Sequence, residues 1–148
     1  MDAREAGLWA RAKDGEGDDV ARLADYEGSA GLVERASSPD LRATAIRAAG
    51  DCRDFGALPW LASVAADVDD ESAMAALDSV AELASQRRRS VDPEDASELR
   101  DGCDRLLALA KDTGRARPRR VVAIRALRML VDRGCVDATQ IPTDVDAK

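Results

Sequence analysis

The sequence contains no histidine, and this absence removes several classes of enzyme. Histidine is the usual base of nucleophilic triads, the commonest metal ligand in proteins and the usual axial ligand of haem. Three cysteines, at 52, 103 and 135, lack the CxxC spacing of zinc and redox sites. We therefore predict a protein that is not an enzyme, with no catalytic residue, no metal and no cofactor.

Three cysteines cannot all pair within one chain, so at least one thiol is free or bonded elsewhere. Cysteine is also a common small residue of protein cores. We interpret Cys52, Cys103 and Cys135 as core residues, with a disulfide as the alternative.

Aromatic residues make up only 3% of the chain, and runs of valine, isoleucine and threonine between turn residues are missing. Alanine, leucine, arginine and the acidic residues dominate, and this composition favours helix over strand. At 148 residues and 45% apolar content, the chain has enough material for one core. We predict an all-α fold with a single domain at 1–135 and an extended or loosely packed tail at 136–148.

No apolar run reaches the ~20 residues of a membrane span. Met1 leads directly into Asp2, Arg4 and Glu5, without the apolar core of a signal peptide. As written, the chain is expected in the cytoplasm, or in the cell envelope or periplasm if an upstream signal was removed.

Positive charge is also in deficit, because the formal net charge is -7. Residues 1–86 carry 8 basic and 18 acidic side chains, whereas residues 87–148 carry 14 basic and 11 acidic ones. An acidic chain has no general attraction for phosphate backbones or anionic lipids. Nucleic acid is therefore an unlikely partner, although the C-terminal half is mildly basic.

Helix signals repeat along the chain. Ser38 and Pro39 are typical of a helix start, and Gly50 is typical of a helix end. Asp54 is expected to begin the next helix, with Pro59 in its first turn, and Asp70 to cap the one after it.

The alanine-rich segment 45–49 recurs at 76–80 and again at 123–127. The second interval is longer by about 16 residues, which we assign to an insertion at 86–92 that contains Arg87, Arg88 and Arg89. A long helix from Pro93 to Gly114 and a last helix opened by Pro118 are expected to follow it. Upstream, we expect a leading helix at 3–13 and a short hairpin of 18–26 and 31–36.

One stretch of the sequence resembles the HEAT repeat of bacterial α-solenoids. It consists of a helix ending at 50–51, a link to Asp54, the pattern Ala-Leu-Pro-x-Leu at 57–61, and aspartates before an alanine-rich helix. The resemblance is clearest over 38–84 and extends over about three-quarters of the chain. It implies antiparallel helix hairpins stacked into a short curved rod, with the second helices on the inner face. Physical reasoning agrees, because one amphipathic hairpin cannot bury its own apolar face. Leu77 and Leu127 are expected between stacked helix pairs.

Enzymes with similar repeats fit poorly. The iron-dependent hydroxylase of this class uses His-Glu pairs, which a chain without histidine cannot supply. The alkylpurine DNA glycosylases are longer and basic and use aromatic side chains, and nothing here supports the bilin site of the phycobilin lyases. The carboxylates at 67–71 lie at a helix start, where capping and the helix dipole explain them better than calcium or acid–base chemistry.

Two groups of residues are candidates for contact with a partner. Trp60 is one position away from the apolar stripe of its helix and close to Val64, and tryptophan is a favoured interface anchor. The alternative is that Trp60 packs between repeats. Arg115, Arg117, Arg119 and Arg120 surround the start of the last helix, where cations oppose the helix dipole, so they are candidates to hold a phosphate or carboxylate. The alternative is a solvated end paired with acids such as Asp112.

The resulting functional hypothesis is a non-catalytic HEAT-repeat adaptor that binds another protein, of unknown identity, on its inner face. The alternative is an anion- or nucleic-acid-binding protein that uses the arginine-rich C-terminal half. An accessory subunit of an enzyme is a third hypothesis.

Overall fold

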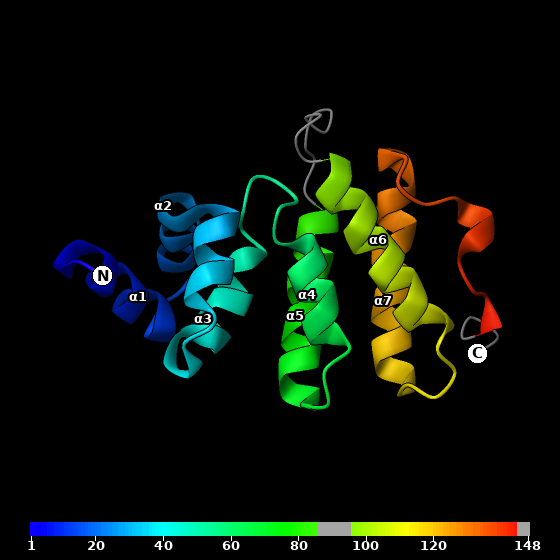
Figure 1. Cartoon of the computed structure of the whole chain (residues 1–148), viewed down its shortest axis with the longest axis horizontal. Coiled ribbons are helices and arrows are strands. Elements are labelled where there is room, and N and C mark those ends of the chain that lie inside the picture. Colours follow the sequence, from blue (N-terminus) through cyan, green and yellow to red (C-terminus); the bar gives the residue numbers. More distant parts are fainter. Residues whose placement is uncertain (86–95, 145–148) are drawn as a thin grey trace.

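The all-α prediction is confirmed by the computed structural model, which describes residues 1–85 and 96–144 and contains helices and no strand within these ranges (Figure 1). The helices are α1 (Ala3–Asp14), α2 (Gly17–Arg35), α3 (Pro39–Ala49), α4 (Leu58–Ala65), α5 (Asp70–Ser85), α6 (Ala96–Lys111), α7 (Arg117–Leu130), and the short 3-10 helices η1 (Val131–Arg133) and η2 (Ala138–Gln140). The expected insertion with Arg87–Arg89 and the expected helix start at Pro93 lie outside the described residues.

Proline and glycine positions set the helix boundaries largely as predicted. Pro39, Pro59 and Pro118 each occupy the first turn of a helix, and Gly50 is the C-cap of α3. The two short segments expected before α3 are present within α2. They meet at a kink at Gly28, whose φ of 70° and ψ of 172° are outside the helical range. Glycine is suited to this position because it adopts positive φ without a steric penalty.

Three expected caps differ from the structure. The Ser38 side chain makes no capping hydrogen bond. Asp54 does not begin α4; its carboxylate accepts hydrogen bonds from the Gly56 amide and the Ser29 hydroxyl in the preceding loop. At the start of α5, the residue that caps is Asp69 and not Asp70: its carboxylate accepts from the Ser72 hydroxyl at 2.6 Å, and this bond lowers the pKa of Asp69.

Helix α5 lies at the centre of the packing. It contacts α3, α4 and α7, while α4 also packs on α6, and α6 packs on α7 (Figure 1). At the N-terminal end, α2 packs on α3, and α1 lies against both. Leu77 of α5 and Leu127 of α7 are both fully buried, as expected. Gly102 allows the close approach of α6 to α4, because a Cβ at this position would overlap the side chain of Leu58.

The interpretation of all three cysteines as core thiols was wrong for two of them. Cys103 of α6 and Cys135, which follows η1, form a disulfide with 6.3 Å between their Cα atoms. Gly134 adopts a φ of 81° immediately before Cys135, and this left-handed turn reverses the chain toward α6. The pairing depends on this tertiary geometry, which spacing alone does not indicate. Cys52 is buried and lies outside the disulfide, as interpreted.

The tail is more tightly packed than expected over its described part. Val136 and Ile141 are buried and belong to the hydrophobic core. Asp137 caps η2 in a capping box with Gln140, and Asp144 forms an ion pair with Arg120. The described part of the tail therefore contributes to the same core as the helices; residues 145–148 lie outside the described part.

Truncation of Leu77 or Leu127 to alanine should lower the free energy of unfolding by about 2 to 5 kcal/mol, because each change leaves a cavity in a fully buried contact between helices. Chemical denaturation measures the loss. Met129→Ala on the exposed side of α7 is the control, and it should cost less than ~0.5 kcal/mol. A loss below ~1 kcal/mol for both leucines would contradict the assigned core.

Candidate functional site

The two candidates on α4 differ in exposure. Val64 is 4% exposed and belongs to the core, so its side chain presents almost no surface. Trp60 is half-buried and packs against the core. The exposed part of the Trp60 ring is thus the only surface that the pair offers to a partner.

The four arginines near the start of α7 do not form one surface cluster. Arg115 pairs with Asp112 at 3.3 Å, the alternative anticipated for the cluster, whereas Arg117 is exposed at the first position of α7. Arg119 and Arg120 are buried, with 6% and 7% of their surface exposed. The structure therefore does not bring these side chains together as one anion-binding surface.

Arg119 binds the C-terminal end of α4. Its guanidinium donates to the carbonyl oxygens of Asp67 at 2.6 Å and Ala65 at 3.4 Å, and to the Asp70 carboxylate at 3.2 Å. Helix C-termini carry unpaired carbonyls and partial negative charge, and both favour a cation. Arg119 of α7 therefore caps the C-terminal end of α4.

Arg120 has the same role at α6. It donates to the carbonyl of Ala110 at 2.9 Å and to the Asp144 carboxylate at 2.9 Å. The start of α7 thus lies beside the ends of two other helices, whose carbonyls receive these arginines. The sequence indicates that these positive charges are unfavourable at the start of α7. It does not show that the negative C-terminal ends of α4 and α6 lie beside them and stabilise them.

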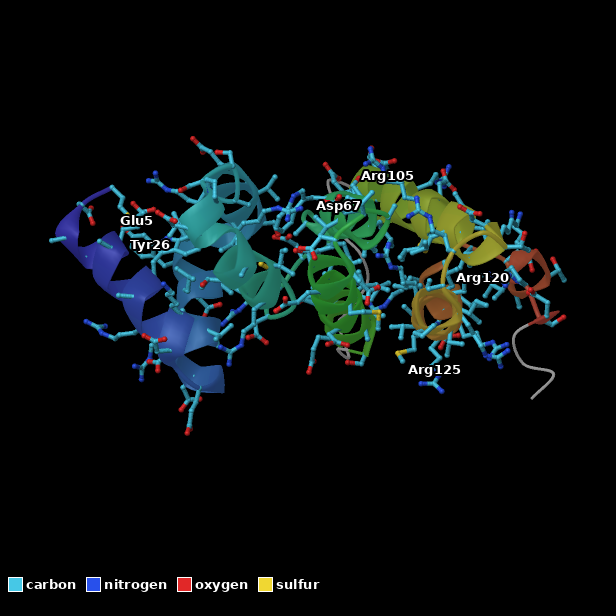
Figure 2. All side chains as sticks on the ribbon, turned by 90° about the horizontal axis from the view of Figure 1, so that it is seen from below. Glu5, Tyr26, Asp67, Arg105, Arg120 and Arg125 are labelled. Atoms are coloured by element: carbon cyan, nitrogen blue, oxygen red, sulfur yellow. A yellow bond between two sulfur atoms is a disulfide. The ribbon has the colours of Figure 1, made fainter. Side chains whose placement is uncertain are left out.

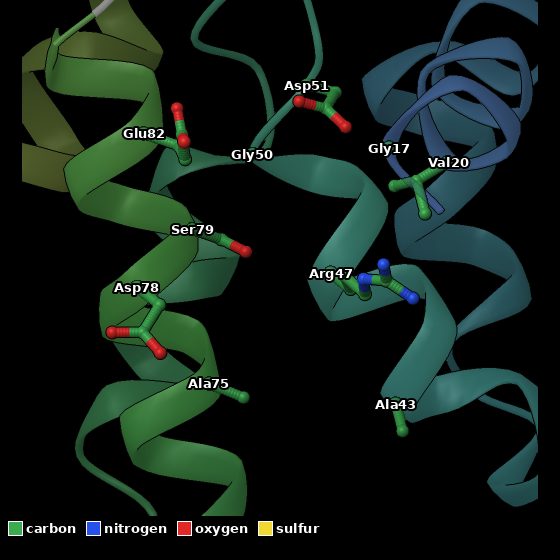
Figure 3. Close-up of a pocket in the computed structure, with 10 residues that line it drawn as sticks. All are labelled: Gly17, Val20, Ala43, Arg47, Gly50, Asp51, Ala75, Asp78, Ser79 and Glu82. Atoms are coloured by element: carbon green, nitrogen blue, oxygen red, sulfur yellow. The ribbon is translucent and has the colours of Figure 1, made fainter. Parts of the chain in front are cut away.

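A groove of about 530 Å³ lies between α3 and α5, and the start of α2 also lines it (Figure 3). Small residues border much of it, which leaves the space unfilled by the protein itself. The residues lining it are Gly17, Val20, Ala43, Arg47, Gly50, Asp51, Ala75, Asp78, Ser79 and Glu82. None of these was a candidate from sequence, because the groove combines three segments far apart in the chain.

The groove is held at one point by a close contact between α3 and α5. The buried Ser79 hydroxyl donates to the carbonyl of Ile46 at 2.6 Å. A Cβ on Gly50 would lie 3.1 Å from the Cα of Ser79, so a larger residue at position 50 would push the helices apart. The contact fixes the separation of the two walls.

Acidic side chains dominate the charge of the groove. Asp51, Asp78 and Glu82 face one basic residue, Arg47, whose guanidinium donates to the carbonyls of Gly15 at 3.1 Å and Ala12 at 3.4 Å (Figure 3). Arg47 thereby caps the end of α1. Burial raises the pKa of Asp51, and the nearby charge of Glu82 raises it further.

A second hollow, of about 320 Å³, lies between α4 and α6. Arg105 and Arg115 border it, and each is ion-paired, with Asp101 at 3.1 Å and Asp112 at 3.3 Å. Figure 2 shows Arg105 and Arg125 on opposite sides of the molecule, so the α6 surface and the exposed surface of α7 face different directions.

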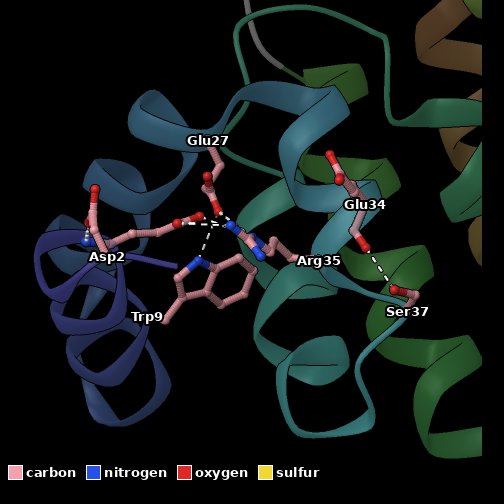
Figure 4. Close-up of polar contacts among 7 residues, drawn as sticks. Asp2, Trp9, Glu27, Glu34, Arg35 and Ser37 are labelled. Atoms are coloured by element: carbon pink, nitrogen blue, oxygen red, sulfur yellow. Dashed lines mark hydrogen bonds and ion pairs between the residues drawn. The ribbon is translucent and has the colours of Figure 1, made fainter.

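Two carboxyl groups meet between α1 and α2 (Figure 4). Arg35 donates to both oxygens of Glu5, at 2.9 and 3.0 Å, and the Trp9 indole donates to Glu27 at 2.9 Å. Burial raises the pKa of Glu27, and its hydrogen bond with Glu5 raises it further; the same bond, followed by Arg35, lowers the pKa of Glu5 against the effect of burial. The cluster attaches α1 to the rest of the fold.

Within residues 1–85 and 96–144, no group of three or more Cys, Asp and Glu side chains is placed to hold a metal ion. No helix in this part of the chain is long and apolar enough to cross a membrane. Comparison of the chain with protein-family models, curated proteins and solved structures finds no match.

Replacement of Arg119 by Gln should lower the free energy of unfolding by about 2 to 3 kcal/mol, because it leaves the carbonyls of Ala65 and Asp67 with weaker partners in a buried place. Thermal and urea unfolding measure the effect. Arg125→Gln removes an exposed charge from the same helix and should change stability by less than ~0.5 kcal/mol. Equal effects of the two changes would contradict the capping role.

Replacement of Glu27 by Gln should stabilise the protein at pH 7. The pKa of Glu27 is raised on folding, so the neutral carboxyl group is better accommodated in the folded protein than the charged one. The contribution of Glu27 to the free energy of unfolding is therefore fully present below its unfolded pKa and is lost as the pH rises through the folded pKa. Gln keeps an acceptor for Trp9 and does not ionise. Thermal unfolding from pH 4 to 8 should therefore show an advantage for E27Q that grows with pH, and none for Glu34→Gln on the exposed surface. An advantage independent of pH would refute the assignment.

Proposed function

We propose that the protein is a non-catalytic, protein-binding module built as a short α-solenoid of stacked antiparallel helix hairpins, similar to HEAT repeats. The pairs α4–α5 and α6–α7 and the contacts of α5 with α3 and α7 support the stacked arrangement. The sequence-based unit had α3 as its first helix and α4, with Trp60, as its second, inner helix, whereas the close contacts pair α2 with α3, α4 with α5 and α6 with α7. In this proposal α3, α5 and α7 are therefore the second helices, and they line the inner face. Stacked hairpins present a continuous surface for binding and have no need of a catalytic centre.

The observation that carries this proposal is the groove between α3 and α5. It lies between α3 and α5, the second helices of the proposed pairs, and not on α4 with Trp60, where the sequence-based hypothesis expected the binding surface. Its walls are held by the contact of Ser79 with Ile46. A rigid, preformed hollow reduces the cost of ordering on binding. The partner in this proposal is another protein, in line with the sequence-based hypothesis.

The alternative of an anion- or nucleic-acid-binding protein has weaker support. Two of its four arginines, Arg119 and Arg120, are bonded to helix ends, and Arg115 is paired with Asp112. Binding of this kind would show a steep dependence on salt, because phosphate contacts release counterions.

The disulfide bears on the compartment. Disulfides form and persist in oxidising compartments and are rare in the cytosol. The Cys103–Cys135 pair therefore supports the cell envelope or periplasm over the cytoplasm as the place of action in this proposal.

A site-specific photo-crosslinker at Ala75 tests the proposed surface. Ala75 is exposed and lines the groove, and Ala108 is its matched control, since it is an exposed alanine on the α4–α6 side. We expect a covalent protein adduct in cells from position 75, none from position 108, and loss of the adduct when Ala43→Trp fills the groove.

The captured protein would then be produced alone, and its dissociation constant measured for the wild type and for A43W. Weakening by more than tenfold in A43W is expected. Equal adducts at the two positions, or equal affinity of A43W, would refute the groove as the binding surface.

A further inference from the structure

The ends of the helices differ in which charge they receive. A helix C-terminus carries unpaired carbonyls and about half a unit of negative charge, so cations stabilise it and carboxylates do not. Three ends receive an arginine from elsewhere in the chain: Arg47 at α1, Arg119 at α4 and Arg120 at α6. Capping by a distant arginine is thus the common arrangement in this fold.

The end of α3 shows the opposite arrangement. Asp51 follows the C-cap of α3 directly, and Glu82 of α5 lies three residues before Ser85, where the described part of that helix stops. Figure 3 shows both carboxylates at the same end of the groove, near Gly50, while Ala43 and Ala75 lie toward the other end. The negative end of α3 and two carboxylates therefore meet at one place.

These carboxylates have no internal partner. Among the described residues, no hydrogen bond or ion pair engages the carboxylates of Asp51, Asp78 or Glu82, and the one arginine of the groove is bound to the end of α1. Burial, followed by the charge of Glu82, raises the pKa of Asp51, and the charge of Arg47 offsets only part of this rise, so gathering these groups has an energetic cost. Local folding rules do not explain why acids stand where cations are favoured.

We propose that the groove binds a partner protein through an arginine or lysine side chain, whose cationic head is held by Asp51 at the end of α3 and by Glu82 of α5. The aliphatic stem would lie along Ala75 and Val20, with Asp78 at the side of the path. A hollow of about 530 Å³ accommodates one or two such side chains from an extended or helical segment. The partner supplies the cation that the chain itself supplies at α1, α4 and α6.

This inference rests on the proposed function and adds the chemistry of the partner. It is tested by titrating the ¹⁵N-labelled protein with a ten-residue alanine-based peptide that contains two arginines. The matched peptides have both arginines replaced by glutamine or by glutamate, and spermine is the free cation. We expect amide shift changes centred on Gly50, Ala75 and Ser79 with the arginine peptide, and changes at least fivefold smaller with the other three ligands.

The double variant Asp51→Asn, Glu82→Gln should weaken the arginine peptide about tenfold, which is the scale of a charge-assisted hydrogen bond. Its control, Asp104→Asn with Glu71→Gln, removes the same charge from exposed positions on α6 and at the start of α5, and it should leave affinity within twofold. The groove variant should also melt about 2 to 4 °C higher than the wild type, because it removes a carboxylate from the C-terminus of α3 and the repulsion between Asp51 and Glu82. If the groove variant has a higher melting temperature and binds the arginine peptide more weakly, the loss of binding is due to the removed carboxylates and not to unfolding.

A third variant replaces Arg87, Arg88 and Arg89 with glutamine, since these cations follow α5 in the sequence and lie outside the described residues. Unchanged peptide affinity supports a partner protein as the source of the cation. An increase above fivefold would assign the cation to the chain itself and overturn the proposal. Equal binding of the glutamine peptide or of spermine, or an equal effect of both double variants, would also overturn it.

The result is distinguishable from failure of the proposed function. If position 75 captures a protein whose binding is insensitive to Asp51→Asn with Glu82→Gln, the proposal of a binding module is supported. The proposal of a cationic partner side chain is then wrong. If position 75 captures nothing and the arginine peptide still binds, the groove recognises the cation and the adaptor proposal fails.

Discussion

Burial of α5 is the constraint on which the rest of the fold depends. Its apolar residues are covered by α3, α4 and α7 together, so no single neighbour removes them from water. A helix with so wide an apolar surface is stable only inside a stack, which is the physical basis of repeat proteins. The position of the groove follows from this, because its second wall is the part of α5 left exposed beside α3.

Electrostatic contacts between helix ends then connect neighbouring pairs. Arg119 joins α7 to the end of α4, and Arg47 joins α3 to the end of α1. The Cys103–Cys135 disulfide ties α6 to the segment after α7, and the buried side chains of Val136 and Ile141 close the C-terminal end of the core. Against this arrangement of satisfied ends, the carboxylates beside Gly50 stand out as groups without an internal role.

Local structure was predictable where proline or glycine determines it, and less so for the capping side chains at 38, 54 and 70. Gly50 ended a helix, Pro59 and Pro118 began helices, and the recurring alanine-rich segments placed Leu77 and Leu127 in the core. Features that need a distant partner were missed. The roles of Arg119 and Arg120 depend on which helix ends lie beside α7, and the disulfide depends on a turn at Gly134. The groove was missed for the same reason, since neither α3 nor α5 contains it alone.

Native-state hydrogen exchange tests the central position of α5 most directly. If α5 holds the two halves of the chain together, the amides of Leu77 and Val80 should exchange only through global unfolding, with protection equal to the free energy of unfolding measured by urea. Amides of α1, which contacts only α2 and α3 among the closely packed helices, should exchange through a smaller opening. Exchange of the α5 amides through a local opening, with α3 and α7 still protected, would contradict the account.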